Sequence, residues 1–155
     1  MKTRLIIVCL LLFVVSPLFL IAETGVGAAF FFTEDGVDGA ALNLSHRKIP
    51  GTILGVRAQF GDDTTMIGLY DDWWLYHSKL AGAVSLYLGP GFYINMVSVE
   101  DGESEFDFGG RLPIGLRFFP IKPIELFVEI APTLSVYPTL PDFGVQGAFG
   151  IRFWF

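Results

Sequence analysis

Residues 145–155 read VQGAFGIRFWF, and this stretch decides the fold class because two kinds of side chain alternate along it. One set is almost wholly apolar: Val145, Gly147, Phe149, Ile151, Phe153 and Phe155. The other is small or polar with one aromatic: Gln146, Ala148, Gly150, Arg152 and Trp154. Successive side chains of a β-strand point to opposite faces. The stretch therefore predicts a strand with one apolar face.

The same alternation recurs upstream and predicts eight strands in all. They lie near residues 24–33, 39–46, 52–61, 65–75, 82–97, 105–119, 124–137 and 143–155. The clearest runs are longer than typical soluble strands of about 5–6 residues. They match the roughly 9–11 residues with which a tilted strand crosses a bilayer. Asp71 falls on the apolar face of the fourth strand, so we expect a bulge or an early strand end there.

The amino-terminal segment has the pattern of a secretory signal peptide. Lys2 and Arg4 precede an unbroken apolar run over residues 5–15, and Ala22 offers a small residue for cleavage. We expect residues 1–22 to be cleaved and residues 23–155 to form one domain; the alternative is a membrane anchor of about 17 residues. The only cysteine, Cys9, lies in this segment, so the mature chain would contain no disulfide.

The composition of the chain favours a membrane barrel. Hydrophobic residues make up 52% and charged residues only 17%, against about 25% charged in typical proteins. Downstream of Gly25, every stretch of 18 residues contains Gly, Pro or a charged residue, so we expect no membrane-spanning helix. A closed barrel is the other structure that satisfies its backbone in lipid. We predict an all-β fold, an eight-stranded antiparallel up-and-down transmembrane β-barrel.

The links between the predicted strands carry opposite charges. Links 46–51, 77–79 and 120–123 are short and basic, whereas links 33–38, 61–63 and 99–103 are acidic. Adjacent links of an up-and-down barrel lie at opposite ends. The charges are therefore sorted to the two ends, and with a periplasmic C-terminus the acidic end faces outward.

These features resemble the small outer-membrane β-barrel families, such as the OmpA membrane domain, OmpX and OmpW. The signal peptide, the hairpin-linked strands and the ending GIRFWF at 150–155 carry the resemblance. A closer one is to uncharacterised spirochaete-type barrels, through SLYLGPGFY at 85–93, RLPIGL at 111–116 and ELFVEIAP at 125–132. The resemblance implies a bacterial outer-membrane location and indicates almost nothing about activity. It also implies an assembly signal read by the barrel-assembly machinery, formed by Phe149, Ile151, Phe153 and Phe155.

Eight charged residues fall on the inner faces of the predicted strands. They are Arg57, Asp72, Asp107, Arg111, Arg117, Glu125, Glu129 and Arg152. Arg117 and Glu125 fall nearly opposite each other, and Arg111 and Glu129 are diagonal neighbours. An eight-stranded barrel is only wide enough for its own side chains, and buried charges are costly unless paired. We therefore expect a salt-bridged plug; the alternative is a narrow polar conduit or gate.

The sequence predicts neither an enzyme nor a cofactor or metal site. His46 and His77 fall in links at one end and Ser98 and Ser104 at the other, whereas nucleophilic catalysis needs Ser and His within hydrogen-bond reach. Two histidines alone are a poor metal site. The acidic cluster could offer oxygens to Ca²⁺, but its spacing matches no EF-hand and favours a solvated surface; it comprises Glu100, Asp101, Glu103 and Glu105.

Further inferences concern partners and function. The net charge of −6 argues against nucleic-acid binding, and an aromatic girdle at the membrane interface accounts for Trp73, Trp74, Tyr76, Trp154 and Phe155. We expect a monomer in outer-membrane lipid with a structural or surface-interaction role. Two alternatives remain: a narrow channel or carrier for small or apolar solutes, and a soluble periplasmic ligand-binding β-barrel.

Overall fold

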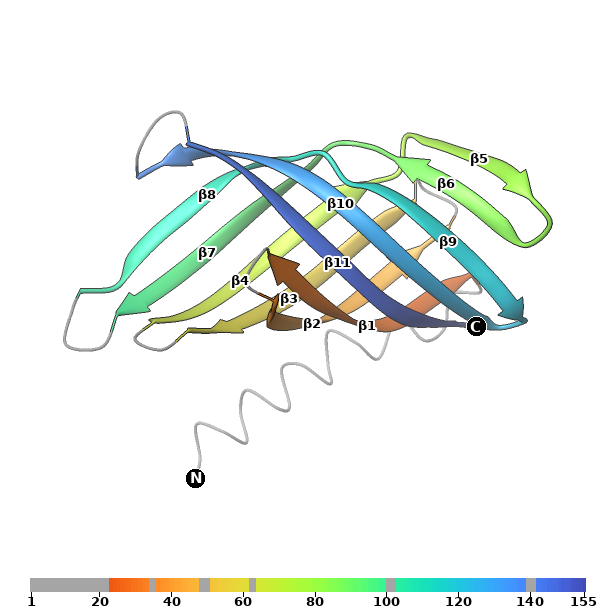
Figure 1. Cartoon of the computed structure of the whole chain (residues 1–155), viewed down its shortest axis with the longest axis horizontal. Helices are drawn as coiled ribbons and strands as arrows, with labels where there is room; N and C mark the ends of the chain where they lie inside the picture. Colours follow the sequence, from red (N-terminus) through yellow and green to blue (C-terminus); the bar gives the residue numbers. More distant parts are fainter. Residues whose placement is uncertain (1–22, 34–35, 48–50, 62–63, 100–102, 139–141) are drawn as a thin grey trace, which may run out of the picture.

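A computed structural model describes residues 23–33, 36–47, 51–61, 64–99, 103–138 and 142–155 (Figure 1). The predicted signal peptide, with Cys9, lies outside the described residues. Within them, no helix is long and apolar enough to cross a membrane. The described strands are β1 (Thr24–Thr33), β2 (Gly36–His46), β3 (Thr52–Phe60), β4 (Thr64–Trp73), β5 (Tyr76–Ala81), β6 (Val84–Leu88), β7 (Gly91–Val99), β8 (Glu105–Arg111), β9 (Ile114–Ile121), β10 (Ile124–Tyr137) and β11 (Asp142–Trp154).

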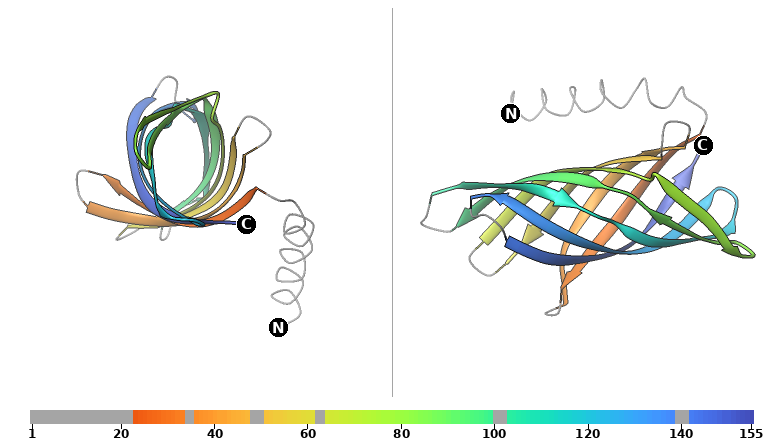
Figure 2. Two further views of the ribbon diagram at one scale, coloured as in Figure 1. Left: turned by 90° about the vertical axis from the view of Figure 1, so that its right-hand side faces the viewer. Right: turned by 90° about the horizontal axis from the view of Figure 1, so that it is seen from above.

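The strands close into an antiparallel barrel, which Figure 2 shows end-on. The closed ring runs β1-β2-β3-β4-β7-β8-β10-β11, and β11 completes it by pairing with both β10 and β1. β4 continues as β5, β6 continues as β7, and β8 continues as β9. β6 pairs with β5 and β9, and β9 pairs with β10. The segments therefore make up eight long strands, and the predicted fold class is confirmed.

Prolines interrupt two strands that the sequence pattern predicted to be continuous. One break lies at Gly89–Pro90, between β6 and β7, and the other at Leu112–Pro113, between β8 and β9. Proline has no backbone N–H to donate to a ladder. Neighbouring strands stay joined there because proline carbonyls still accept: Gly89 N donates to Pro113 O at 3.3 Å, and Leu112 N to Pro132 O at 2.9 Å.

The fourth long strand differs from the prediction at two points. β4 runs in register through Asp71, which faces Leu54 of β3 and Phe92 of β7, so the predicted bulge is wrong. β4 does end early, at Trp73, but after Leu75 the strand resumes as β5. The predicted link at 77–79 is therefore wrong as well, since the chain turns at Gly82, whose φ of 53° favours glycine. His77 consequently lies within β5 rather than in a turn.

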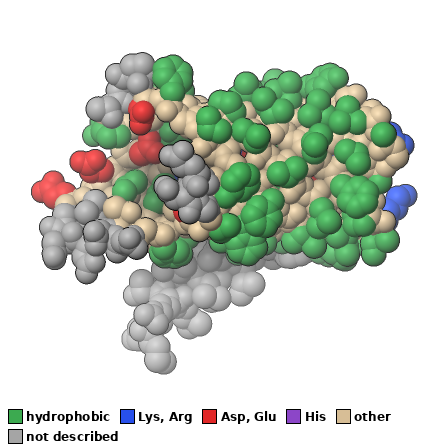
Figure 3. Space-filling model, viewed as in Figure 1, with side chains coloured by type: hydrophobic (Ala, Val, Ile, Leu, Met, Phe, Trp, Pro, Cys, Tyr) green, Lys and Arg blue, Asp and Glu red, His purple; other side chains and the backbone are tan. Residues whose placement is uncertain are grey.

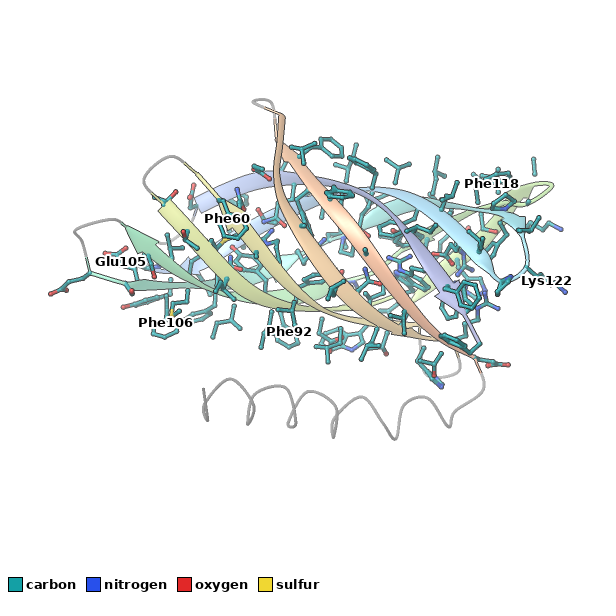
Figure 4. The ribbon with its side chains drawn as sticks, turned by 90° about the horizontal axis from the view of Figure 1, so that it is seen from below. Phe60, Phe92, Glu105, Phe106, Phe118 and Lys122 are labelled. Atoms are coloured by element: carbon teal, nitrogen blue, oxygen red, sulfur yellow. The ribbon has the colours of Figure 1, made fainter. Side chains whose placement is uncertain are left out.

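The two faces of the barrel differ in chemistry. Outward-facing apolar side chains are exposed along its whole length, such as Phe92 at 46%, Phe118 at 42% and Phe106 at 53%, and they project away from the ribbon in Figure 4. Figure 3 shows these side chains over the middle of the surface, with acidic groups gathered at one end and basic groups at the other. We call these the acidic end, marked by Glu105, and the basic end, marked by Lys122 (Figure 4).

Candidate functional site in the lumen

The lumen holds the residues with the strongest claim to function. Of the eight predicted inner charges, Arg57, Asp72, Arg111, Glu125, Glu129 and Arg152 are at most 5% exposed, and Asp107 and Arg117 are half-buried. Seven of them form three groups, and Arg117 lies outside these groups. We call these the middle group, the basic-end group and the acidic-end group.

The middle group joins three strands through one guanidinium. Arg111 of β8 places Nη2 2.6 Å from Oε1 of Glu129 in β10, and its Nε lies 3.3 Å from Oδ1 of Asp72 in β4. Tyr87 of β6 donates its hydroxyl to the other Glu129 oxygen at 2.7 Å. The Arg111 guanidinium also lies 4.9 Å from the centre of the Tyr70 ring. One cation thus bridges two carboxylates across the lumen.

The basic-end group is built on the ion pair of Arg152 and Glu125. These residues face each other directly on β11 and β10, with Nη1 2.5 Å from Oε1. Arg152 Nε donates to Asn43 at 3.1 Å, and Trp154 Nε1 donates to the second Glu125 oxygen at 3.0 Å. The guanidinium stacks 3.6 Å from the centre of the Phe127 ring. Both Glu125 oxygens are therefore satisfied without water.

The acidic-end group is linked by hydrogen bonds through an amide. Arg57 Nη2 donates to Asn95 Oδ1 at 3.2 Å, and Asn95 Nδ2 donates to Asp107 at 3.0 Å. Ser135 donates to the other Asp107 oxygen at 2.7 Å. Asn95 therefore connects a buried cation to an anion.

Small inward-facing residues make room for these large side chains. Gly115 of β9 faces Tyr87 of β6, and a Cβ on Gly115 would lie 2.1 Å from the Tyr87 Cζ. Gly55 of β3 faces Tyr70 of β4 in the same way, again at 2.1 Å. The two tyrosine rings can lie across the lumen only because their partners have no side chain.

Two expectations are wrong, one about the partner of Arg117 and one about the burial of two tryptophans. Arg117 faces Phe127 rather than Glu125, because β9 continues to Ile121, which pairs with Ile124 of β10. Glu125 forms its ion pair with Arg152 instead. Trp74 and Trp154 do not belong to an interfacial girdle, since they are 4% and 5% exposed and point into the lumen. Trp73, Tyr76 and Phe155 are exposed at 36%, 52% and 57%.

Sequence reasoning missed the neutral members of the three groups. Tyr87 and Asn95 fall on the inner face of the predicted strand 82–97, so the alternation indicates the direction of both side chains. A neutral inner side chain carries no charge that would distinguish it in the sequence from a structural polar residue. Asn43 lies in the weakly patterned second strand, and its contact with Arg152 spans 109 residues of sequence.

The remaining candidates stay apart. The Ser98 and Ser104 hydroxyls hydrogen-bond to each other at 2.9 Å beside the β7–β8 link, while His46 ends β2 and His77 lies in β5 at the other end. Among the described residues, no group of three His, Cys, Asp or Glu side chains could hold a metal ion. Glu100 and Asp101 of the acidic cluster lie outside the described residues.

The predicted assembly residues Phe149, Ile151, Phe153 and Phe155 face outward, at 43–57% exposed.

This architecture defines the class: a small, closed, eight-stranded antiparallel β-barrel, apolar outside and charged within. Among solved structures, the chain is similar to Neisserial surface protein A, with a TM-score of 0.62 and 14% identity over 85% of this chain and 94% of that one. It is also similar to Ail, the attachment invasion locus protein of Yersinia pestis, with a TM-score of 0.51 and 17% identity over 87% of this chain and 100% of that one. Both are outer-membrane barrels. No protein-family model and no curated protein matches the chain.

Proposed function

We propose that the protein is a non-enzymatic, non-conducting barrel of the bacterial outer membrane that acts through its outer surface or by stabilising the envelope. The observation that carries this proposal is the set of buried ion pairs across the lumen. Arg111 with Asp72 and Glu129, and Arg152 with Glu125, are all at most 5% exposed. A conduit would need these groups to be hydrated, whereas they are buried and lie within ion-pair distance of one another.

The location rests on the outer surface and on the likeness in fold. Apolar residues cover the outside of the barrel, and a soluble protein rarely exposes so large a contiguous apolar surface. A soluble ligand-binding barrel would reverse the two faces, with an apolar interior. The surface role draws on the two similar structures, which are a surface protein and an attachment protein by name.

Single-channel conductance in a planar bilayer tests the proposal. We expect the folded, inserted protein to show no discrete openings, because the ion pairs occupy the lumen. A triple variant, Asp72→Ala, Arg111→Ala and Glu129→Ala, removes the middle group and should show increased conductance if the basic-end group leaves a path. Lys79→Ala, on exposed β5, is the matched surface control.

Reproducible openings of the unmodified protein would overturn the non-conducting barrel and favour the channel. A heat-unfolded sample controls for leakage that does not come from the barrel. Circular dichroism of each variant before reconstitution establishes that it retains its β-structure.

A further inference from the structure

A pocket at the basic end of the barrel gathers cations over aromatic rings. Its volume is about 480 Å³, and its walls include three cations and three rings: Arg47, Arg117, Lys122, Phe119, Trp154 and Phe155. These residues come from the link after β2, strand β9, the β9–β10 turn and the end of β11. The pocket therefore lies at the mouth of the lumen, beyond the Arg152–Glu125 pair.

The two arginines of this pocket are held by rings rather than by carboxylates. The Arg47 guanidinium lies 4.0 Å from the centre of the Trp154 ring and 5.2 Å from that of Phe119. Arg117 lies 5.2 Å from the Trp74 ring and 5.9 Å from the Phe119 ring. A guanidinium over a ring face keeps its full positive charge, and its N–H groups stay available at the edge.

The pocket also differs from the lumen in its charge balance. The side-chain ion pairs of the described residues involve Arg111 and Arg152 of the lumen, and Asp72, Glu125 and Glu129 are their partners. The Arg117 Nε is buried and has no hydrogen-bond acceptor. Three cationic side chains line one cavity, and the Arg117 Nε there lacks an acceptor, which favours an anion.

We propose that this pocket binds a phosphate group. Guanidinium groups match the geometry of phosphate oxygens and bind them in pairs of hydrogen bonds. The rings of Phe119 and Phe155 in the pocket wall offer apolar contact to whatever carries the phosphate. With the basic end toward the periplasm, one source is the headgroup of an anionic phospholipid of the inner leaflet, and the other is soluble phosphate.

The test measures binding to the folded protein in maltoside micelles, whose headgroups contain no phosphate. One arm titrates short-chain phosphatidylglycerol and the other titrates inorganic phosphate, with tryptophan fluorescence and calorimetry as readouts. Sodium chloride at equal ionic strength controls for screening. We expect saturable binding, weakened about tenfold or more by Arg47→Gln and by Lys122→Gln, since each removes a charge-assisted contact.

Lys79→Gln is the matched control, because Lys79 is an exposed cation of β5 and does not line the pocket. Saturation by the lipid alone assigns the site to a phospholipid headgroup, and equal saturation by both assigns it to the free ion. The proposal is overturned if neither ligand gives a saturable change beyond that of chloride. It is also overturned if both pocket variants, folded by circular dichroism, bind as tightly as the parent.

Discussion

Arg111 lies between the carboxylates of Asp72 and Glu129, and all three side chains are buried. Charges removed from water cost several kcal/mol each unless they are paired. The energetic consequence is asymmetric. Removing Arg111 alone leaves two buried carboxylates without a cation. Removing all three charges leaves no buried charge unpaired. At the scale of the residue, Arg111 is therefore the position at which a single substitution should cost most.

We expect Arg111→Met to lower the free energy of unfolding by about 3–5 kcal/mol, the range found when one partner of a buried ion pair is removed. Urea unfolding in lipid vesicles, followed by tryptophan fluorescence, measures it. Lys79→Met makes the same change of residue type at an exposed site and should cost less than about 0.5 kcal/mol. Combining Arg111→Met with Asp72→Asn and Glu129→Gln should recover part of the loss. A single Arg111→Met variant as stable as the parent would contradict the role given to this ion pair.

At the scale of the element, the strands approach each other through glycines that face large rings. β6 and β9 pair with Gly115 opposite Tyr87, and the Tyr87 ring fills the space that a side chain on Gly115 would need. The ring in turn positions the hydroxyl that donates to Glu129. The packing of two strands and the hydrogen bonding of the middle group thus depend on one missing Cβ.

We expect Gly115→Ala to destabilise the barrel by about 1–3 kcal/mol, the usual cost of overpacking, because the added methyl overlaps the Tyr87 ring. Gly110→Ala is the matched control in the same long strand, since a Cβ there would meet nothing closer than 3.9 Å. Thermal or urea unfolding of the two variants in the same micelles provides the comparison. Equal stability of the two variants would show that the Tyr87 ring moves aside at no cost.

At the scale of the whole molecule, charge is sorted along the barrel axis. Glu105 and Lys122 mark opposite ends, and a broad apolar surface lies between them (Figures 3 and 4). This arrangement suits a protein with water at each end and lipid around its middle. The proposed orientation places the acidic end outside the cell and the phosphate-binding pocket in the periplasm.

Cysteine labelling in intact cells tests that orientation, because Cys9 is the only cysteine of the chain and lies in the predicted signal peptide. We expect Glu103→Cys to react with a membrane-impermeant maleimide in intact cells. Lys122→Cys should react only after the outer membrane has been permeabilised. Both positions are exposed, so a difference between them reports the side of the membrane rather than burial. The reverse pattern would invert the barrel.

The sequence by itself determined the number of strands, their faces and the charge at each end. These follow from an alternation of period two, which is local: whichever strands become neighbours, Phe149 and Ile151 point to one side and Arg152 to the other. Strands β1 and β10 begin and end where the pattern predicts. The prolines at positions 90 and 113 were visible too, but their effect depends on the hydrogen bonds of the adjacent strands.

Only the tertiary structure decided which inner charges meet. Glu125 pairs with Arg152, and Arg117 lies among aromatic rings at the mouth of the barrel, because β9 and β10 pair in a register that places Arg117 opposite Phe127. Arg111 reaches Asp72 and Glu129 because closing the sheet brings side chains of β4, β8 and β10 together across the lumen. Contacts across a closed barrel depend on strand stagger and curvature, which are properties of the whole sheet rather than of any one strand.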